Sequence, residues 1–405
     1  GEHNVRVVKT IDGTCAGPDD LIARVVHGEV DVPWFLHVDN PRHRASFFDM
    51  DALEGGSLRV LPVKFVAMVP CSLVNDTNST KLKAVVDFGH GLLYSREELL
   101  HCHFLHRIAN DNGYLLVATN WRGMSELDLP VVLRTFIAQP NLFKAGRDNL
   151  IQGYADKAAL QHFYRNGLLG MDFLTFEGKK QIVLESNEPK FIFYGISQGG
   201  ILGSAYSSLM GPSQLIDRSI LGSPGTPFAL LMSRSDIFPF YRALLSLNLS
   251  HLRHVRIFIT LIQMAYDSVE SAGVLAPPLT EPFPRTLIQA GLGDSTVTTY
   301  GTEIMARAFN ASIFPDNPRK VFGLAIEPGA NSTWRGPLSA LTEVVYVQEN
   351  ASIPISNNGA KHNHVHWCVR LDAALQRQLV SFVNGGNIID PCLEDGCIRP
   401  NATCW

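Results

Sequence analysis

The sequence predicts an α/β protein with a mostly parallel central sheet that is covered by helices on both faces. Apolar runs of strand length alternate with helical segments through much of the 405 residues, and strands separated by helices pair in parallel within one buried sheet. The polar residues with catalytic potential follow the ends of these runs, and parallel sheets carry their chemistry at the carboxyl ends of strands. A mostly helical stretch, residues 228–284, interrupts the alternation and is expected to be a helical cap insertion.

Strands are expected where short apolar runs, rich in β-branched and aromatic residues, are bounded by turn-forming residues. These runs cover residues 5–8, 23–26, 58–69 (as a strand pair), 82–88, 114–118, 190–194, 219–221, 285–290 and 343–348. Helices are expected at residues 95–109, 149–163, 201–209, 299–309 and 371–383. In the last of these, apolar residues recur at helical spacing on one face.

This pattern divides the chain into four parts. Residues 1–57 form a β-rich extension, residues 58–227 and 285–385 form the sheet domain, residues 228–284 form the cap, and residues 386–405 form a tail rich in cysteine. The sheet domain is therefore expected to be built from two segments, one on each side of the cap.

Charge and hydropathy exclude several classes of partner. The formal net charge is −4 and only 18% of the residues are charged, with no basic block that would bind nucleic acid or an anionic membrane surface. No apolar run approaches the ~20 residues that span a bilayer. The expected partner is a small molecule, and nothing in the sequence indicates an oligomeric state.

Sequons and cysteines indicate a secreted protein or one in the lumen of the secretory pathway. Seven cysteines are present, three of them in the tail, which favours disulfides and an oxidising compartment. The odd count leaves one thiol outside any disulfide, and Cys102 is the predicted one. Because the chain begins at Gly1, a mature form without its signal peptide is expected. Seven glycosylation sequons occur, where chance would give about three: Asn75, Asn78, Asn248, Asn310, Asn331, Asn350 and Asn401.

Ser197 is the candidate nucleophile. It lies in Gly195-Ile196-Ser197-Gln198-Gly199, a G-x-S-x-G pattern between a strand-like run and a helix-like run. A tight turn in that context presents a serine above the sheet, and the two glycines remove side chains that would clash there. An ordinary Gly-Ser turn is the alternative, and the strand before and the helix after argue against it.

A second turn is the candidate oxyanion hole. The strand at residues 82–88 ends in Gly89-His90-Gly91, and such a turn lets backbone N–H groups face a developing oxyanion. The predicted donors are the N–H groups of Leu92 and Gln198, while the His90 side chain is expected to be structural. Trp121-Arg122-Gly123 also follows a strand end and either lines a pocket or packs a loop.

Asp294 is the candidate acid, because it follows the strand at residues 285–290 in a Gly-rich turn. An aspartate there can hold a histidine in the right tautomer and stabilise its cation. The alternative is that Asp294 caps the helix that follows. The chain order of serine, aspartate and histidine favours the catalytic role.

Three histidines are candidates for the base, because they lie between the last expected strand and the last expected helix. His366 is favoured, since it is nearest to the final helix and is expected on a short loop. His362 is the second choice and His364 the third.

A metal site is the competing interpretation of the clustered histidines. The three candidates alternate along the chain, and a second group of His101, Cys102, His103 and His106 falls on an expected helix. Zinc sites use such residues, but neither H-E-x-x-H nor a paired C-x-x-C accompanies them. No metal is therefore predicted.

Taken together, these motifs resemble the α/β-hydrolase superfamily over about residues 58–385. The residues on which the resemblance rests are the turn at residues 195–199, the His90-Gly91 turn, Asp294 and a histidine before the last helix. The resemblance implies acyl transfer to water through an acyl-enzyme, without a cofactor, most often on esters and in other members on amides or peptides. It also implies that residues 228–284 are a cap or lid. The tail is similar to that of secreted tripeptidyl-peptidase-like members, whereas residues 1–57 and the histidine-rich segment depart from the pattern.

The predicted function is hydrolysis of a carboxylic ester by Ser197, His366 and Asp294. The cap is rich in aromatic and aliphatic residues, which indicates a small-molecule or lipid-like ester as substrate. Two alternatives stay open. One is a secreted serine peptidase or amidase of the same fold, and the other is a non-catalytic binding module on a hydrolase scaffold.

Overall fold

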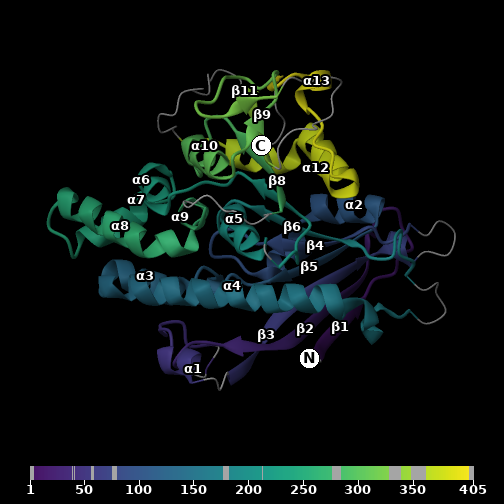
Figure 1. The fold of residues 1–405 in the computed structure, drawn as a ribbon, viewed down its shortest axis with the longest axis horizontal. Coiled ribbons are helices and arrows are strands. Elements are labelled where there is room, and N and C mark those ends of the chain that lie inside the picture. The colour runs from purple at the N-terminus through teal and green to yellow at the C-terminus, as the bar shows by residue number, and fades with distance from the viewer. Residues whose placement is uncertain are drawn as a thin grey trace. The chain divides into compact units, whose positions relative to one another are not determined.

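The chain forms two compact units (Figure 1). Unit 1 comprises residues 1–131, 144–193 and 215–217, and unit 2 comprises residues 132–143, 194–214 and 218–405. The boundary falls within strand β6 (Lys190–Ile196). The structure, a computed structural model, describes residues 4–38, 40, 42–55, 59–74, 80–176, 182–211, 213–275, 284–327, 339–347 and 362–400.

The strands of unit 1 follow the order β1-β2-β3-β5-β4. Pairing is antiparallel from β1 to β5 and parallel between β5 and β4. In place of the strand pair expected at residues 58–69, a single strand covers Arg59–Pro70. The first two strands come from the expected N-terminal extension. The bounds are β1 (Val5–Asp12), β2 (Ile22–Trp34), β3 (Arg59–Pro70), β4 (Ala84–Gly89) and β5 (Tyr114–Thr119).

Helices of unit 1 pack on this sheet. The long helix α4 (Phe143–Asn166) contributes Phe163 and Tyr164 to a core shared with β2 and β3, where the rings of Phe65 and Phe163 lie 5.7 Å apart. The helix expected at residues 95–109 is broken at Cys102 into a 3-10 turn (Arg96–His101) and α2 (His103–Asn112), which ends at left-handed Gly113. The remaining helices named in this part of the chain are α1 (Met50–Glu54) and α3 (Leu129–Ile137), the latter crossing the unit boundary.

Unit 2 is built on parallel strands in the order β7-β8-β11-β9-β10. Strands β8 and β11 are buried along nearly their whole length, as expected for a parallel sheet covered on both faces. The bounds are β7 (Arg218–Gly222), β8 (Arg285–Gly291), β9 (Ser312–Ile313), β10 (Ala325–Ile326), β11 (Ser339–Val347) and β12 (Ile398–Pro400), which pairs with β11.

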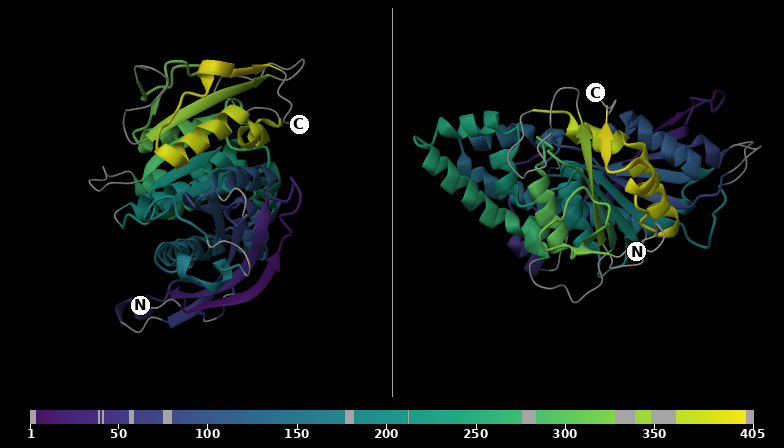
Figure 2. Two further views of the ribbon diagram at one scale, coloured as in Figure 1. Left: turned by 90° about the vertical axis from the view of Figure 1, so that its right-hand side faces the viewer. Right: turned by 90° about the horizontal axis from the view of Figure 1, so that it is seen from above.

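Residues 228–275, expected from the sequence to belong to a cap, are mostly helical. Helices α6 (Phe228–Arg234), α7 (Pro239–Ser246) and α8 (Leu252–Tyr266) lie side by side (Figures 1 and 2) around an apolar cluster that includes Met232, Leu245 and Ile259. The short α9 (Ser271–Val274) follows. The other helices of unit 2 are α5 (Gln198–Met210), α10 (Thr299–Ala308), α11 (Val365–Leu371), α12 (Ala373–Gly385) and α13 (Cys392–Asp395).

Disulfides tie down both ends of the described chain. Cys15 pairs with Cys71 and Cys392 with Cys397, and Cys368 is also disulfide-bonded. Cys102 is a buried thiol outside these bonds, which confirms the prediction for the odd cysteine.

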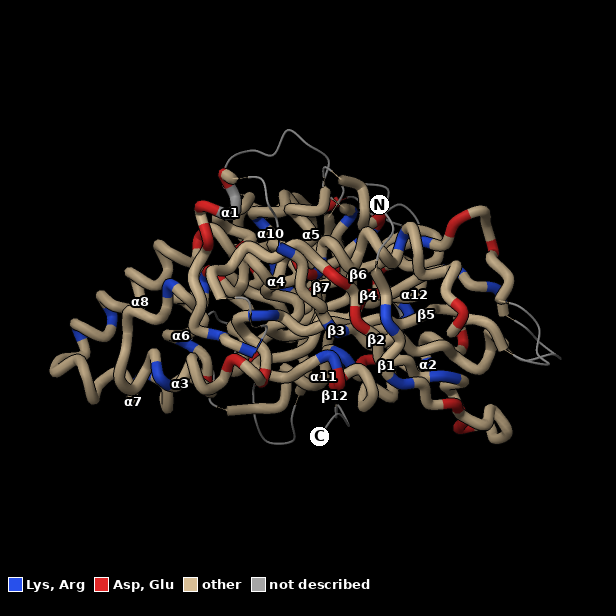
Figure 3. The backbone as a smooth tube through the Cα atoms, turned by 90° about the horizontal axis from the view of Figure 1, so that it is seen from below, with Lys and Arg blue, Asp and Glu red and all other residues tan. Residues whose placement is uncertain are grey.

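Mostly parallel strands flanked by helices, a serine between strand β6 and helix α5, and a helical insertion between β7 and β8 define the α/β-hydrolase fold. The predicted fold class is therefore confirmed. Lys and Arg are interspersed with Asp and Glu along the backbone of each unit (Figure 3). Within the described ranges, no helix combines the length and apolarity needed to cross a membrane.

Candidate active site

Ser197 occupies a strained turn between β6 and α5. Its backbone has φ 59° and ψ −127°, a region that residues with a side chain rarely adopt and that often marks functional sites. Its N–H donates to the carbonyl oxygen of Gly222 at 2.8 Å, and the side chain is nearly buried. A Cβ at Gly195 would lie 2.3 Å from the carbonyl oxygen of Gly199, so the turn requires glycine there.

Hydrogen bonds join the carboxyl ends of the neighbouring strands. The N–H of Ser223, just after β7, donates to Gln289 of β8 at 2.8 Å, and the N–H of Leu292, just after β8, donates to Val344 of β11 at 2.9 Å. Together with the Ser197–Gly222 bond, these hydrogen bonds connect the carboxyl ends of β6, β7, β8 and β11 along one edge of the sheet. Asp294 follows β8 at this edge.

Asp294 and His366 form a buried pair. His366 Nδ1 lies 2.7 Å from Asp294 Oδ2, and both residues are at most 5% exposed. The other carboxylate oxygen of Asp294 accepts the N–H groups of Thr296 at 2.8 Å and Val297 at 2.9 Å. Helix α10 begins later, after Thr298. Asp294 therefore accepts hydrogen bonds within its own turn and pairs with His366, and it does not cap the helix.

His366 lies in the first turn of α11, not on the short loop expected from the sequence. The helix packs on β11 through a buried cluster that includes Val365, Val369 and Tyr346. A Cβ at Gly291, the last residue of β8, would lie 2.4 Å from the Val365 side chain. The absence of a side chain at Gly291 thus lets α11 approach closely enough for His366 to reach Asp294.

The other two histidines have different surroundings. His362 has a side chain that is 76% exposed, and its Nδ1 lies 2.7 Å from Asp236 Oδ2. Asp236 also accepts the hydroxyl of Ser295 at 2.8 Å. His364 precedes α11, and its carbonyl accepts the N–H of Trp367. Across the described ranges, no three His, Cys, Asp or Glu side chains are grouped so as to hold a metal ion.

His90 holds the turn after β4. Nδ1 donates to the carbonyl of Gly91 at 2.9 Å, so Nε2 accepts the N–H of Trp121 at 2.8 Å. Burial lowers the pKa of His90 to about 3, which keeps the ring neutral and suited to this pair of contacts. The side chain is thus structural, as expected, and the half-buried Leu92 follows in the same turn.

Unit 1 contains a buried ion pair that was not predicted from the sequence. Lys157 Nζ lies 2.9 and 3.0 Å from the two carboxylate oxygens of Asp87, and both side chains are buried. The ammonium also lies 4.6 Å from the centre of the Trp121 ring. The available signal was an aspartate inside the otherwise apolar run Ala84-Val85-Val86-Asp87-Phe88, since a charge in such a strand needs a partner.

Two of the seven expected glycosylation sites lie within the described residues. Asn248 and Asn310 are both exposed. Asn75, Asn78, Asn331, Asn350 and Asn401 lie outside the described residues.

Comparison with known proteins gave structural similarity only. No protein-family model matches, and no curated protein matches the sequence. The S-formylglutathione hydrolase from Agrobacterium tumefaciens is similar at 11% identity and a TM-score of 0.42, covering 93% of this chain and 98% of that one. Carboxyl esterase 2 from the fungus Tuber melanosporum is similar at 15% identity and 0.39, covering 80% of each chain. The cell wall degrading esterase from Xanthomonas oryzae is similar at 12% and 0.40, covering 80% and 89%.

Proposed function

We propose that the chain is a secreted serine hydrolase that cleaves a carboxylic ester with Ser197 as nucleophile, His366 as base and Asp294 as the carboxylate of the triad, which orients His366. The observation that carries the proposal is the buried His366–Asp294 pair at the strand edge on which the Ser197 turn also ends. Such a pair, in chain order after a strained serine, is the arrangement that activates a hydroxyl for acyl transfer.

The proposed reaction has two steps. His366 takes the proton of the Ser197 hydroxyl as its oxygen attacks the ester carbonyl, and the same histidine then protonates the leaving alcohol. Water, deprotonated by His366, next attacks the acyl-enzyme; the bond between the acyl carbon and Ser197 Oγ breaks, the acid leaves, and His366 returns its proton to Ser197. The N–H groups of Leu92 and Gln198 are the proposed donors to the oxyanion of each tetrahedral intermediate.

The cap supports a lipid-like ester as substrate. Part of its apolar surface is used internally, since Phe238 and Leu245 are buried in the cap cluster. Another part faces outward: Ile257, Leu261 and Met264 on α8 are 52%, 49% and 70% exposed. Their spacing puts them along one side of the helix, and exposed apolar patches often mark binding surfaces. An acyl chain or an apolar alcohol group is therefore the proposed contact.

Turnover of p-nitrophenyl butyrate and p-nitrophenyl octanoate tests the proposal. Ser197→Ala is expected to lose nearly all activity. Ser207→Ala is the matched control, because Ser207 is buried on the same helix and its hydroxyl makes no hydrogen bond within the described residues. Full activity of the folded Ser197→Ala chain, or no activity of the wild type on any ester, would refute the proposal and favour the binding module.

The histidine variants separate the candidates for the base. His366→Ala is expected to lower kcat by several orders of magnitude, while His362→Ala and His364→Ala retain most of it. Loss of activity in His362→Ala alone would instead assign the base to the pair with Asp236.

A further inference from the structure

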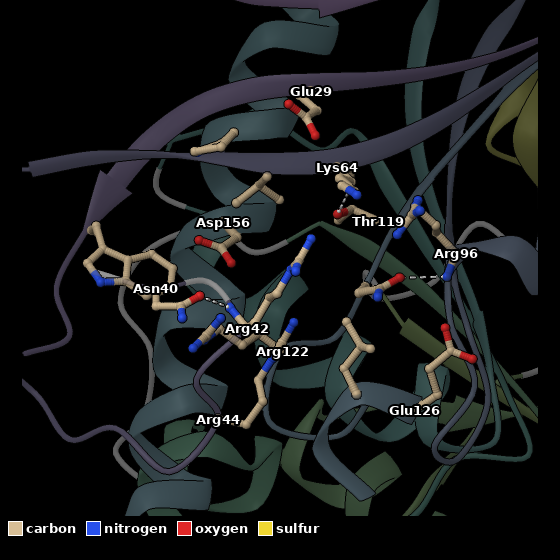
Figure 4. Close-up of a pocket in the computed structure, with 15 residues that line it drawn as sticks. Glu29, Asn40, Arg42, Arg44, Lys64, Arg96, Thr119, Arg122, Glu126 and Asp156 are labelled. Carbon is tan, nitrogen blue, oxygen red and sulfur yellow. Dashed lines mark hydrogen bonds between the residues drawn. The ribbon is translucent and has the colours of Figure 1, made fainter. Parts of the chain in front are cut away.

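A cavity with a basic lining lies wholly within unit 1. Its volume is about 610 Å³, which is the size of a typical small-molecule site. Five cationic and three acidic side chains line it, so the lining has an excess of two positive charges although the whole chain has a net charge of −4. The cationic residues are Arg42, Arg44, Lys64, Arg96 and Arg122, and the acidic ones are Glu29, Glu126 and Asp156 (Figure 4).

Arg122 is fixed in the wall of this cavity. Its Nε donates to Asn149 Oδ1 and one terminal nitrogen donates to the carbonyl of His43, both at 2.8 Å. The guanidinium also lies 4.4 Å from the centre of the Trp34 ring. Burial, and after it the charge of Arg44, lower the pKa of Arg122 to about 10. The group therefore stays charged at neutral pH beside a second cation.

Arg44 is nearly buried and weakly neutralised. Its side chain is 10% exposed, and the nearest approach to a carboxylate is 3.5 Å from Asp128. Asp128 already accepts the N–H and hydroxyl of Ser125 at 2.8 and 2.6 Å. Arg44 Nε is buried and has no hydrogen-bond partner within the described part of the chain, and the same holds for Nε of Arg96. Buried N–H donors without a partner are rare and costly, which points to an absent acceptor.

Figure 4 shows Arg42, Arg44 and Arg122 reaching the same part of the cavity, next to Asp156. The carboxyl of Asp156 accepts from Gln152 at 2.7 Å. Asp156 and Asp128 are thus the two carboxylates beside these three guanidinium groups, which leaves one positive charge in excess. An oxyanion placed among them would supply the missing negative charge.

We infer that this cavity binds a small organic anion, whose carboxylate or phosphate group is held by Arg42, Arg44 and Arg122. The planar fork of a guanidinium matches two oxygens of either group. The cavity is much larger than a phosphate ion, so the ligand has a body as well as an anionic group. The uncharged part of the lining combines polar Asn40, Thr119 and Asn120 with apolar Trp34, Pro62, Val63 and Leu127, and it fits a body that carries hydroxyl groups beside an apolar face.

Isothermal titration calorimetry of the full chain at constant ionic strength tests this inference. The probes are glucose 6-phosphate, galacturonate, neutral glucose and inorganic phosphate. Saturable binding is expected for at least one of the two anionic sugars and not for glucose. Tighter binding of galacturonate would assign a carboxylate ligand, and tighter binding of glucose 6-phosphate a phosphate ligand. The titrations are repeated on Ser197→Ala, so that the result does not depend on the proposed hydrolysis.

Two charge-removing variants and one control complete the test. Arg42→Gln, at an exposed position, and Arg44→Gln are each expected to weaken binding roughly tenfold. Arg107→Gln removes the same charge from an exposed position on α2 in the same unit and is expected to change nothing. The inference is overturned if no probe binds, if glucose or inorganic phosphate binds as tightly as both anionic sugars, or if both cavity variants bind like the wild type.

Discussion

Lys157→Met is expected to destabilise unit 1 strongly, because it leaves the carboxylate of Asp87 buried without its cation. The two side chains are 0% and 3% exposed, and the ammonium nitrogen lies 2.9 and 3.0 Å from the carboxylate oxygens. At about 3 Å and an effective dielectric constant of about 20, their attraction is about 5 kcal/mol. Removal of one partner from a buried pair costs about 3–5 kcal/mol, of which the stranded charge is the main part.

Urea unfolding followed by circular dichroism measures this loss. The double variant Asp87→Asn, Lys157→Met removes both charges and is expected to recover part of the lost stability. Lys144→Met, at an exposed position on the same helix α4, is the control and is expected to change stability by less than about 0.5 kcal/mol. A Lys157→Met chain as stable as the control, or a double variant no more stable than the single one, would show that the buried charge of Asp87 does not need Lys157.

Three further predictions concern pH, cross-linking and the serine turn. Burial raises the pKa of Glu270 to about 7 from 4.5, so the folded state binds more protons than the unfolded state between pH 4.5 and pH 7. The free energy of unfolding should therefore fall by about 3 kcal/mol as the pH rises through this range. Urea unfolding of Glu270→Gln at several pH values should not show this fall. The double variant Cys15→Ser, Cys71→Ser removes a disulfide that joins residues 56 positions apart, and its free energy of unfolding should fall by about 2–4 kcal/mol. An unchanged urea midpoint would contradict this. Gly195→Ala places a Cβ 2.3 Å from Gly199 and should abolish ester turnover, whereas wild-type rates would show that the turn accommodates a side chain.

The sequence was sufficient for the parts of the molecule that local pattern determines. The buried strand Tyr114–Thr119 is an almost continuous apolar run followed by turn residues, so its existence and type could be predicted from the sequence. The turn at Ser197 could be predicted for the same reason, because its two glycines and the strand and helix patterns beside it are close together in the sequence. Cys102 was identified as the odd cysteine, although the helix expected there is broken at that residue.

Features that depend on residues far apart in the sequence could not be predicted from it. The cavity in unit 1 gathers side chains from the loop at residues 40–44, from β3 and from α4, and no spacing along the chain links them. The choice among three histidines also rested on position alone, whereas in the structure His366 and His362 each approach a different aspartate. The strand pair expected at residues 58–69 became one strand, because Pro62 faces Asp31 within the β2–β3 pairing and does not end it.

Labelling with a fluorophosphonate, followed by intact mass measurement and peptide mapping, tests whether Ser197 is the nucleophile and His366 its base. One adduct is expected, on Ser197, and it should be absent in Ser197→Ala, strongly reduced in His366→Ala, and retained in His362→Ala and His364→Ala. No adduct on the folded wild-type chain, an adduct on another residue, or labelling that is indifferent to His366 would contradict it.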